Sequence, residues 1–594
     1  LSGSLLYALV FGPVIGSIIG KAGSLSKTAK AKLSTLENGD PRTLNSLTGV
    51  YARLLGFATR YAIVTMTITI SVLFTTFWAY GQYGSGLIYF SQGDTKYANL
   101  SVRARGNLSV DEIFALVTEV EAQVIGVEGI QHLNTYTTLP GEPGRDGGND
   151  RVGGMFIELY DLRNRRASSE NILEEIRDKT KDIVGIQVEI QAMDMGPPVG
   201  KPLNIEFSSR DRRVIDPAVQ KVVDYMINEI EGLRDIDDTR SLPGVEFKIN
   251  VDRAQAAIYN ADVTQVGVAV QLVTNGIKVG EYRPDRADDA VDIRVRYPDA
   301  QRGIMALDKL NISTPTGMVP LSNFVSLEPV PNVDTIQRVD GIPIKKVLAN
   351  VAPGVLADDK VKEIQTWIDG QDWPPGLKIE FRGANEEQAE TLAFVGVAFG
   401  MSLLLMFVLL VTQFNSFYQS ALILFAVILS TAGVLIGLLI TGNPFSAILT
   451  GVGVVALAGI VVNNNIVLID TYNQLRREDP NLHYMELIIR TGAQRLRPVM
   501  LTTITTVFGL LPLASNYSVD LVNRTVVYGS ELSSFWVPLS QAIVSGLTFA
   551  TLLTLVTTPA MLALPHQVRA IKNKLLKKSE RRVGATTKPA LAAD

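Results

Sequence analysis

Three consecutive amide side chains, Asn463, Asn464 and Asn465, lie inside the apolar run GIVVNNNIVLID of residues 459–470. An amide in lipid is costly because its donors and acceptors lose their hydrogen bonds to water. Successive helical residues are about 100° apart, so the three amides cover about 200° and cannot share one face. They can form hydrogen bonds or line a hydrated ion path, but an amide cannot carry a proton near neutral pH.

The residues around these amides predict a helix that is packed inside a bundle. Small residues precede them and would let helices approach closely: Gly451, Gly453, Ala456, Ala458 and Gly459. The next apolar region offers hydrogen-bonding partners: Arg495, Thr502, Thr503, Thr505 and Thr506. Two interpretations remain open, a hydrated proton path or plain interhelical hydrogen bonds worth about 0.6 kcal/mol each.

The group that would carry a proton is missing from the apolar runs. A carrier must titrate in the accessible pH range, but no Asp, Glu or His occurs in the middle of any run. Asp470 lies near the end of one run and is expected at the membrane interface. The chain starts in an apolar run without a preceding charged region, which indicates a truncated span rather than a signal peptide. We therefore expect the acids on a preceding part of a longer polypeptide.

Other residues with catalytic or metal-binding chemistry are few. The 594 residues include no cysteine, three histidines and no HExxH spacing, so no disulfide, zinc site or other metal site is predicted. No nucleophile–base motif occurs, so neither an enzyme nor a cofactor is predicted. The net charge of −4 argues against a nucleic-acid partner. Met155, Met193 and Met195 could bind copper or silver through sulfur, although methionine more often fills gaps in a core.

Apolar runs predict seven membrane spans, the first of them incomplete, because each run approaches the roughly 20 residues that cross a bilayer. They cover residues 1–20, 61–80, 392–411, 420–440, 445–469, 498–514 and 535–564. Basic residues gather in segments 21–60, 471–497 and 565–594, which fall on one side if every run crosses. Positive charge marks the cytoplasmic side. The insert between the second and third runs is therefore expected outside the cytoplasm.

This insert, residues 85–390, alternates strand patterns with amphipathic helices. Up to residue 200 the order is strand–helix–strand twice, as in a split βαβ sandwich, and Ser109 is the predicted N-cap of the first helix. A second such unit begins at residue 201 and is interrupted by residues 244–330. Within the interruption, residues 253–276 are expected to be helical. A glycine- and proline-rich stretch in the first unit, LPGEPGRDGGNDRVGG, predicts a mobile loop, with a plain surface connection as the alternative.

Several stretches resemble the C-terminal half of a resistance-nodulation-division (RND) superfamily multidrug efflux permease of the hydrophobe/amphiphile exporter type. TQFNSFYQSALILFAVILS resembles a short cytoplasmic turn and the span after it. GIVVNNNIVLID resembles the tenth span, and RLRPVMLTTITTVFGLLPL the eleventh. GPPVGKPLNIEF resembles the junction of two porter sandwiches. The resemblance covers essentially the whole chain and places Leu1 in the sixth span.

The resemblance implies an α-helical polytopic membrane protein with a large periplasmic α+β insert. The insert would contain two split βαβ (ferredoxin-like) porter sandwiches, the second interrupted by a docking subdomain. The implied domains are the end of a truncated transmembrane helix (1–20), a cytoplasmic connector (21–60), a transmembrane helix (61–84), porter subdomain 1 (85–200), porter subdomain 2 (201–243 and 331–390), the docking subdomain (244–330), five transmembrane helices (391–564) and a basic cytoplasmic tail (565–594).

The resemblance further implies a proton relay formed by Asn463, Asn464, Asn465, Arg495 and Thr502. Drug exporters have a lysine at the position of Asn463, and it pairs with two aspartates of the fourth span. Asn464, Arg495 and Thr502 match the relay positions of the family. Because an asparagine holds no proton, coupling here would rely on carboxylates with neutral hydrogen-bond partners.

The implied drug pocket lies between the two sandwiches, beneath a switch loop. The loop residues are Leu139, Pro140, Gly141, Gly144, Gly147, Gly148, Gly153 and Gly154. Phe156 matches a pocket phenylalanine, whereas Asn134 and Leu139 stand where phenylalanines are expected. Tyr136 is expected to replace them in part, with a core position as the alternative. Stacking on flat aromatic drugs would be correspondingly reduced.

The function implied is that of a permease subunit in the inner membrane of a Gram-negative bacterium, exporting hydrophobic or amphiphilic compounds by proton antiport. Such permeases contact membrane lipids, form homotrimers and work with a periplasmic adaptor protein and an outer-membrane channel. The proton-binding carboxylates would lie in the N-terminal half of the same permease. Metal export, export of lipid or sterol-like cargo, and a non-pumping role in protein translocation or assembly are the alternatives.

Overall fold

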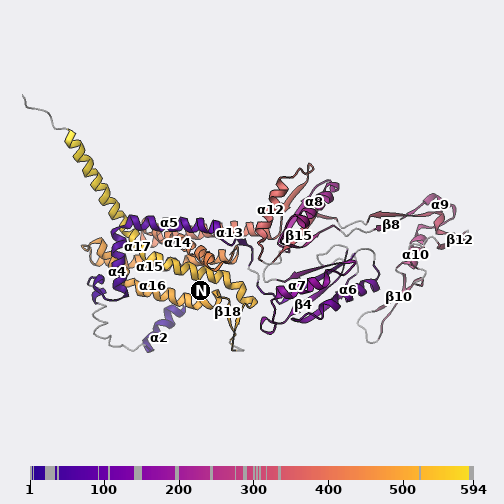
Figure 1. Cartoon of the computed structure of the whole chain (residues 1–594), viewed down its shortest axis with the longest axis horizontal. Coiled ribbons are helices and arrows are strands. Elements are labelled where there is room, and N and C mark those ends of the chain that lie inside the picture. Colours follow the sequence, from indigo (N-terminus) through magenta and orange to yellow (C-terminus); the bar gives the residue numbers. More distant parts are fainter. Residues whose placement is uncertain are drawn as a thin grey trace, which may run out of the picture.

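The computed structural model describes residues 3, 6–19, 34–36, 39–90, 93–104, 108–138, 150–193, 200–240, 245–274, 276–284, 290–298, 302, 306, 309–315, 317–331, 336–352, 354–520 and 524–586. The long axis of the molecule runs from a helical bundle, through two small α+β units, to a third α+β segment at the far end (Figure 1). Apolar helices and soluble units are thus separated along this axis.

Within these residues, six helices contain stretches that are long and apolar enough to cross a membrane. They are α5 (Ala62–Tyr83), α13 (Ala384–Phe414), α14 (Phe417–Thr441), α15 (Leu449–Glu478), α16 (Tyr484–Ala514) and α17 (Glu531–Thr586). The first expected run forms a shorter apolar helix, with π-helical turns at Tyr7–Phe11 followed by α2 (Gly12–Ile19). Six of the seven predicted runs are therefore candidate spans.

Several helices extend well beyond the apolar runs that predict them. α15 continues to Glu478 and α16 begins at Tyr484, so most of the segment expected as a connector, residues 471–497, is helical. A helix satisfies its own backbone hydrogen bonds, so it need not end where its apolar surface ends. The basic connector also contains a helix, α4 (Leu47–Arg60), which lies across one end of the bundle (Figure 1).

The bundle is packed around α17, which contacts α14, α15 and α16. The contact depends on glycine: a Cβ on Gly546 would lie 2.2 Å from Leu457 Cδ2 and 2.9 Å from Val434 Cγ2. A Cβ on Gly433 would lie 3.0 Å from the Cα of Gly546. Small residues thus bring the backbones of α14 and α17 together, as is common in membrane bundles.

The first α+β unit contains β2 (Tyr97–Ala104), α6 (Val110–Val124), β3 (Ile130–Thr137), β4 (Arg151–Leu159), α7 (Ser169–Thr180) and β5 (Ile186–Ala192). Its strands form an antiparallel sheet in the order β3-β4-β2-β5. Alternate strand residues and the inner faces of α6 and α7 form one core. Ser109 caps α6, as predicted, and forms a capping box with Glu112.

The second unit repeats this connectivity with β6 (Leu203–Ser208), α8 (Ile215–Asn228), β7 (Leu233–Asp238), β15 (Ile342–Val351), α12 (Ala357–Asp369) and β16 (Lys378–Phe381). The sheet order is β14-β15-β6-β16, with β7 also paired to β15 and β14 at Gln337–Val339. In both units the strands follow the order of a split βαβ fold.

The described residues of the segment inserted between β7 and β14 form two-stranded sheets, two short α-helices and a 3-10 turn at Leu321–Asn323. Its elements are β8 (Val245–Val251), α9 (Arg253–Ile258), α10 (Val263–Val273), β9 (Ile277–Tyr282), β10 (Val291–Val295), β11 (Asn311–Thr314), β12 (Gly317–Pro320) and β13 (Val325–Pro331). The stretch expected to be helical is broken at Asn260, whose φ is 50°. The Asp262 side chain then accepts from Thr264 N and starts α10.

Candidate functional site

The three amides of α15 have different surroundings, as their helical spacing requires. Asn465 is buried, with 2% of its surface exposed. Its Oδ1 accepts a hydrogen bond of 2.8 Å from the hydroxyl of Thr558 on α17, and its Nδ2 donates to Val461 O at 3.3 Å. Asn465 therefore makes an interhelical hydrogen bond, which was the plainer of the two interpretations of the amide run.

Asn464 and Asn463 turn progressively away from this contact. Asn464 is half-buried and Asn463 is exposed on the surface of the bundle formed by the described residues. An exposed amide between apolar positions on a membrane helix is unfavourable against lipid. These two amides are thus the members of the run that are available to another helix or to water.

The two other predicted relay residues lie on α16. The Nε of Arg495 donates to the hydroxyl of Thr471, which lies on α15. Thr502 is exposed, and its hydroxyl donates to Val499 O of its own helix at 2.9 Å. Thr471 follows Asn465 by six residues, which corresponds to about 9 Å along a helix axis. Arg495 is therefore held about one and a half turns from the buried amide.

A row of threonines on α17 is the part of this polar network that sequence reasoning missed. Thr551, Thr554 and Thr558 are buried. Thr558 binds Asn465, and the Thr551 hydroxyl lies 3.0 Å from that of Thr503 on α16. Their spacing of three and four residues places them on one helix face. That spacing within an apolar run was the available signal.

In the first α+β unit, the sheet face opposite α6 and α7 carries Phe156. This side chain is 37% exposed and stacks on Tyr97, with ring centroids 5.6 Å apart. Its cross-strand neighbours are Asn99 and Asn134, which are both exposed. The face thus combines an aromatic pair with hydrogen-bonding side chains, a combination that can bind an amphiphilic molecule.

Tyr136 lies on the same face but is fixed in place. A Cβ on Gly154 would lie 2.8 Å from the Tyr136 hydroxyl and 3.1 Å from its Cζ, so the ring covers this glycine. Arg151 donates to the hydroxyl at 2.7 Å, and its guanidinium lies 5.9 Å from the ring centroid. Tyr136 is therefore neither a core residue nor a freely moving aromatic group.

The predicted switch loop falls mostly outside the described residues. Leu139, Pro140, Gly141, Gly144, Gly147 and Gly148 belong to this undescribed part. Gly153 and Gly154 lie within β4. A Cβ on Gly153 would meet Val117 Cγ2 of α6 at 2.8 Å, so close helix–sheet packing requires a glycine there.

The three methionines considered for soft metals do not share one environment. Met155 is 1% exposed and belongs to the core beneath the sheet, whereas Met193 is 42% exposed. Met195 lies outside the described residues. Among the residues that are described, no group of three His, Cys, Asp or Glu side chains is placed to hold a metal ion.

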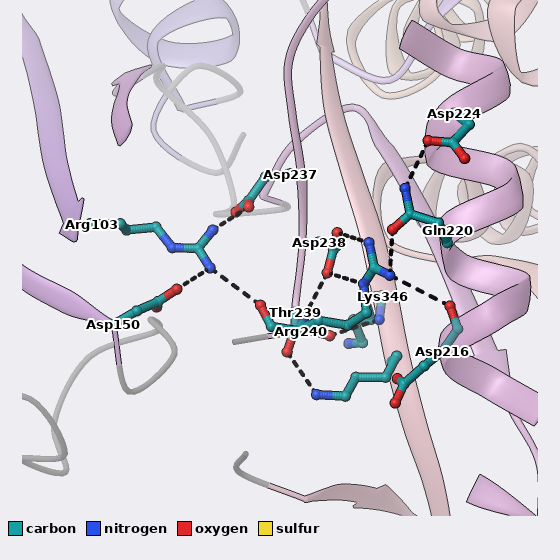
Figure 2. A network of polar contacts seen from close by, with 11 residues as sticks. Arg103, Asp150, Asp216, Gln220, Asp224, Asp237, Asp238, Thr239, Arg240 and Lys346 are labelled. Carbon is teal, nitrogen blue, oxygen red and sulfur yellow. Dashed lines mark hydrogen bonds and ion pairs between the residues drawn. The ribbon is translucent and has the colours of Figure 1, made fainter. Parts of the chain in front are cut away.

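The face that carries Phe156 meets the second unit at its other end. Arg103, on β2, forms ion pairs with Asp150 at 2.7 Å and with Asp237 of β7 (Figure 2). Burial raises the pKa of Asp237, although Arg103 and Lys201 act to lower it. Burial acts to lower the pKa of Arg103, but its two carboxylates outweigh this effect and raise it. The two units are thus in contact at Arg103.

In the part of the chain that the structure describes, six apolar helices with buried polar contacts are joined to two similar α+β units, which is the arrangement of a polytopic membrane protein. The sequence profile of the AcrB/AcrD/AcrF family matches residues 1–566. The chain belongs to this family of RND transporters and is not an enzyme. It is a multi-pass membrane protein, with six candidate spans in the described residues.

Its relatives are named for resistance to different compounds. It is 30% identical over 374 residues to the cobalt-zinc-cadmium resistance protein CzcA of Cupriavidus metallidurans, an alignment that covers 61% of this chain and 33% of that protein. It is 24% identical to the multidrug resistance protein MdtC of Photorhabdus laumondii, covering 96% of this chain and 52% of the relative. The chain thus spans about half or less of the length of these relatives.

The fold is similar to a solved structure, the X-ray crystal structure of a heavy metal efflux pump. The TM-score is 0.74 at 22% sequence identity, and the match covers 88% of this chain and 52% of that one. At this identity the likeness concerns the fold and leaves the cargo open.

Proposed function

We propose that this chain belongs to an inner-membrane RND permease that exports hydrophobic or amphiphilic compounds by proton antiport. The aromatic pair of Phe156 and Tyr97, on a sheet face that also carries the exposed amides Asn99 and Asn134, is the observation that carries this proposal. Stacking would hold the apolar part of a cargo, and the neighbouring amides would bind its polar groups. Residues 85–200, and 201–243 with 331–390, would be the porter subdomains, residues 244–330 the docking subdomain, and residues 139–154 the switch loop.

The amides of α15 would serve as neutral partners in the proton path. Asn463 and Asn464 face outward from the described bundle, and Thr502 is also exposed. A carboxylate on a facing helix could accept hydrogen bonds from the amides and would be the proton carrier, because an amide cannot titrate. This helix would come from the N-terminal half of the permease. A homotrimer, a periplasmic adaptor and an outer-membrane channel complete the proposed system.

Cargo can be tested by measuring the growth of an efflux-deficient bacterium that expresses the complete permease. We expect protection against bile salts and lipophilic cations, and Phe156→Ala should remove most of it. Phe114→Ala is the matched control, because Phe114 is 63% exposed on α6, on the opposite side of the same unit. Equal protection by the two variants would contradict a cargo site at Phe156.

Export of divalent metal is the second candidate, favoured by the 30% identity to CzcA. The same strains would be grown with cobalt, zinc or copper salts. Protection against metal alone, unaffected by Phe156→Ala, would select this alternative. The burial of Met155 and the exposure of Met193 argue against a three-methionine site without rearrangement.

Proton coupling can be tested at Asn464. We expect Asn464→Leu to abolish resistance, because it removes a hydrogen-bonding partner of the proton path. Trimer assembly should not be reduced, because leucine is of similar size and suits an apolar helix. Thr505→Val is a suitable control, since the Thr505 hydroxyl bonds only within its own helix in the described residues. Unchanged resistance in Asn464→Leu would count against the relay.

A further inference from the structure

The two α+β units are joined through one edge strand. β7 pairs with β15 on one side, so its other edge is free of strand pairing in the described sheet. The register between β7 and β15 shifts at Leu348–Asn350, and the opposite residue Asp235 has a φ of 47°. Such a bulge redirects side chains away from the regular strand pattern. The bulge in β7 lies beside Asp235 and Asp237, whose carboxylates contact the first unit.

Charged side chains cross this boundary in both directions. Arg177 of α7 pairs with Asp235 at 3.3 Å, and Arg234 of β7 pairs with Glu174 of α7 at 2.6 Å. Lys201, at the start of the second unit, pairs with Glu189 of β5 at 2.9 Å and donates to Asp235 O at 2.7 Å. Each unit thus supplies both acidic and basic groups, which fixes how the two units are aligned.

Arg103 is the most buried cation of this boundary that bridges two carboxylates. Its side chain is 10% exposed, and those of Asp150 and Asp237 are 7% and 18% exposed. Figure 2 shows the guanidinium lying between the two carboxylates, with a further contact of 3.5 Å to Arg240 O. A lysine could not match this arrangement, because its ammonium is a single point rather than a planar fork.

The two carboxylates belong to different units. Asp150 lies within the glycine-rich stretch, and its carbonyl accepts from Ala104 N at 2.9 Å, so it is fixed to β2 through backbone as well as side chain. Asp237 lies on β7 of the second unit. Separation of the units must therefore break the Arg103–Asp237 pair, while the Arg103–Asp150 pair can persist.

We propose that Arg103 is a positioning residue that latches the second unit to the first and thereby limits how far the two units separate. This proposal rests on the proposed function only in taking the sheet face of Phe156 as part of the route of the cargo. Loss of the Asp237 contact would weaken the attachment of β7 to the first unit, leaving the pairs at Asp235, Arg234 and Lys201 to hold it.

This chain contains no cysteine, so two introduced cysteines are its only labelling sites, and any cysteine elsewhere in the complete permease would be replaced by serine. Glu170→Cys on α7 and Ile227→Cys on α8 place spin labels on exposed positions of the two units. Double electron–electron resonance would be recorded on the purified complete permease. We expect Asp237→Asn to raise the ratio of long to short distances about tenfold or more, because one charge of a largely buried pair is lost.

Asp238→Asn is the matched control. Asp238 is the next residue of β7, but it pairs with Arg240 of its own unit at 2.8 Å (Figure 2). This variant should leave the distances unchanged. Equal distance distributions in Asp237→Asn, Asp238→Asn and the parent would overturn the latch.

Arg103→Lys provides a second variant if Asp237→Asn does not fold. It keeps the charge but cannot bridge both carboxylates in the same way, so we expect an intermediate ratio of distances. In transport assays, the latch predicts a changed KM for cargo with little change in the amount of assembled protein. If the variants shift the distances but the parent transports no cargo, the latch is retained and the proposed function is refuted. If the parent transports cargo but the variants leave the distances unchanged, the proposed function is retained and the latch is refuted.

Discussion

The polar contacts of the membrane bundle and those of the α+β units use different chemistry. In the bundle, Asn465 meets Thr558, and both side chains are neutral. Between the α+β units, Arg103 meets Asp150 and Asp237, and all three are charged. Buried charge is costly in lipid, whereas next to water it can be compensated by paired groups. In both regions each of these buried polar groups has a partner. The membrane bundle uses neutral hydrogen bonds, which are weak, and the boundary between the α+β units uses ion pairs, which are strong.

The weak polar contacts of the bundle are accompanied by tight packing. Helices α14 and α17 approach at Gly433 and Gly546, where an added Cβ would clash. The boundary between the α+β units instead contains mainly charged side chains on α7, β2 and β7. Shape complementarity therefore holds the bundle together, and electrostatic complementarity holds the two units together.

The largest effect should come from removing the bridging charge. Arg103→Met leaves two carboxylates largely buried without their cation, which should lower the local stability of β2 by about 3 kcal/mol. Hydrogen exchange of the β2 amides in the complete protein would measure this, since Ala104 N is bonded to Asp150 O. Arg213→Met is the control, because Arg213 is 90% exposed and pairs with Asp211 at the surface. If Arg103→Met lost no more protection than Arg213→Met, the ion pairs of Arg103 would not be strong contacts, and the contrast with the neutral contacts of the bundle would not hold.

The next effect tests packing in the bundle. Gly546→Val would place a side chain against Leu457 and Val434, and overpacking of this kind costs about 1–3 kcal/mol. Gly396→Val on α13 is the matched control, because a Cβ there meets nothing within 4 Å. Unfolding of the purified protein by a denaturing detergent would compare the two variants. Equal stability of both would show that the glycine contact does not hold the helices together.

Local signals in the sequence predicted much of the fold. Ser109 and Glu112 mark the start of α6 through contacts within one helical turn, so no knowledge of tertiary structure was needed. The order of strands and helices in each α+β unit also follows from periodicity alone. The break at Asn260 was missed, because a positive φ at a single asparagine leaves little trace in an apolar pattern.

The candidate site was predictable only in part. Polar residues in the apolar run singled out Asn465, but its partner Thr558 lies on the last helix rather than the next one. Similarly, nothing in the sequence around Arg103 indicates Asp237, which follows more than a hundred residues later. Both contacts depend on which helix or strand packs against which, and hydropathy does not encode this choice.

A smaller effect distinguishes two helix caps of the first unit. Ser109→Ala should reduce the stability of the first turn of α6 by about 1 kcal/mol, measured by hydrogen exchange. Hydrogen bonds from the Ser109 backbone and hydroxyl hold the pKa of Glu112 below its ordinary value of 4.5. The stabilisation by Glu112 is therefore fully present above pH 4.5 and is lost as the pH falls through the lower folded-state pKa.

Ser168 provides the comparison for this acid dependence. It caps α7 by accepting from Asn171 N. Asn171 takes the place that Glu112 has in α6, and its side chain is an amide rather than a carboxylate. Ser168→Ala should therefore cause a similar loss of protection in α7, and the parent cap should weaken less in acid than that of α6. The same pH dependence at both helices would show that Glu112 does not contribute to its cap.

The smallest effect concerns the buried amide itself. Asn465→Leu and Thr558→Val, alone and combined, form a double-mutant cycle whose interaction free energy should be about 0.6 kcal/mol, the typical value for a hydrogen bond inside a membrane bundle. The unfolded state in a membrane also finds hydrogen-bonding partners, which is why so buried a contact contributes so little. Thr503→Val and Thr551→Val provide a second cycle at a bond of 3.0 Å. An interaction free energy above about 2 kcal/mol at Asn465 alone would mean that this amide stabilises its region as an ion pair does, and the distinction between the bundle and the α+β units would fail at this residue.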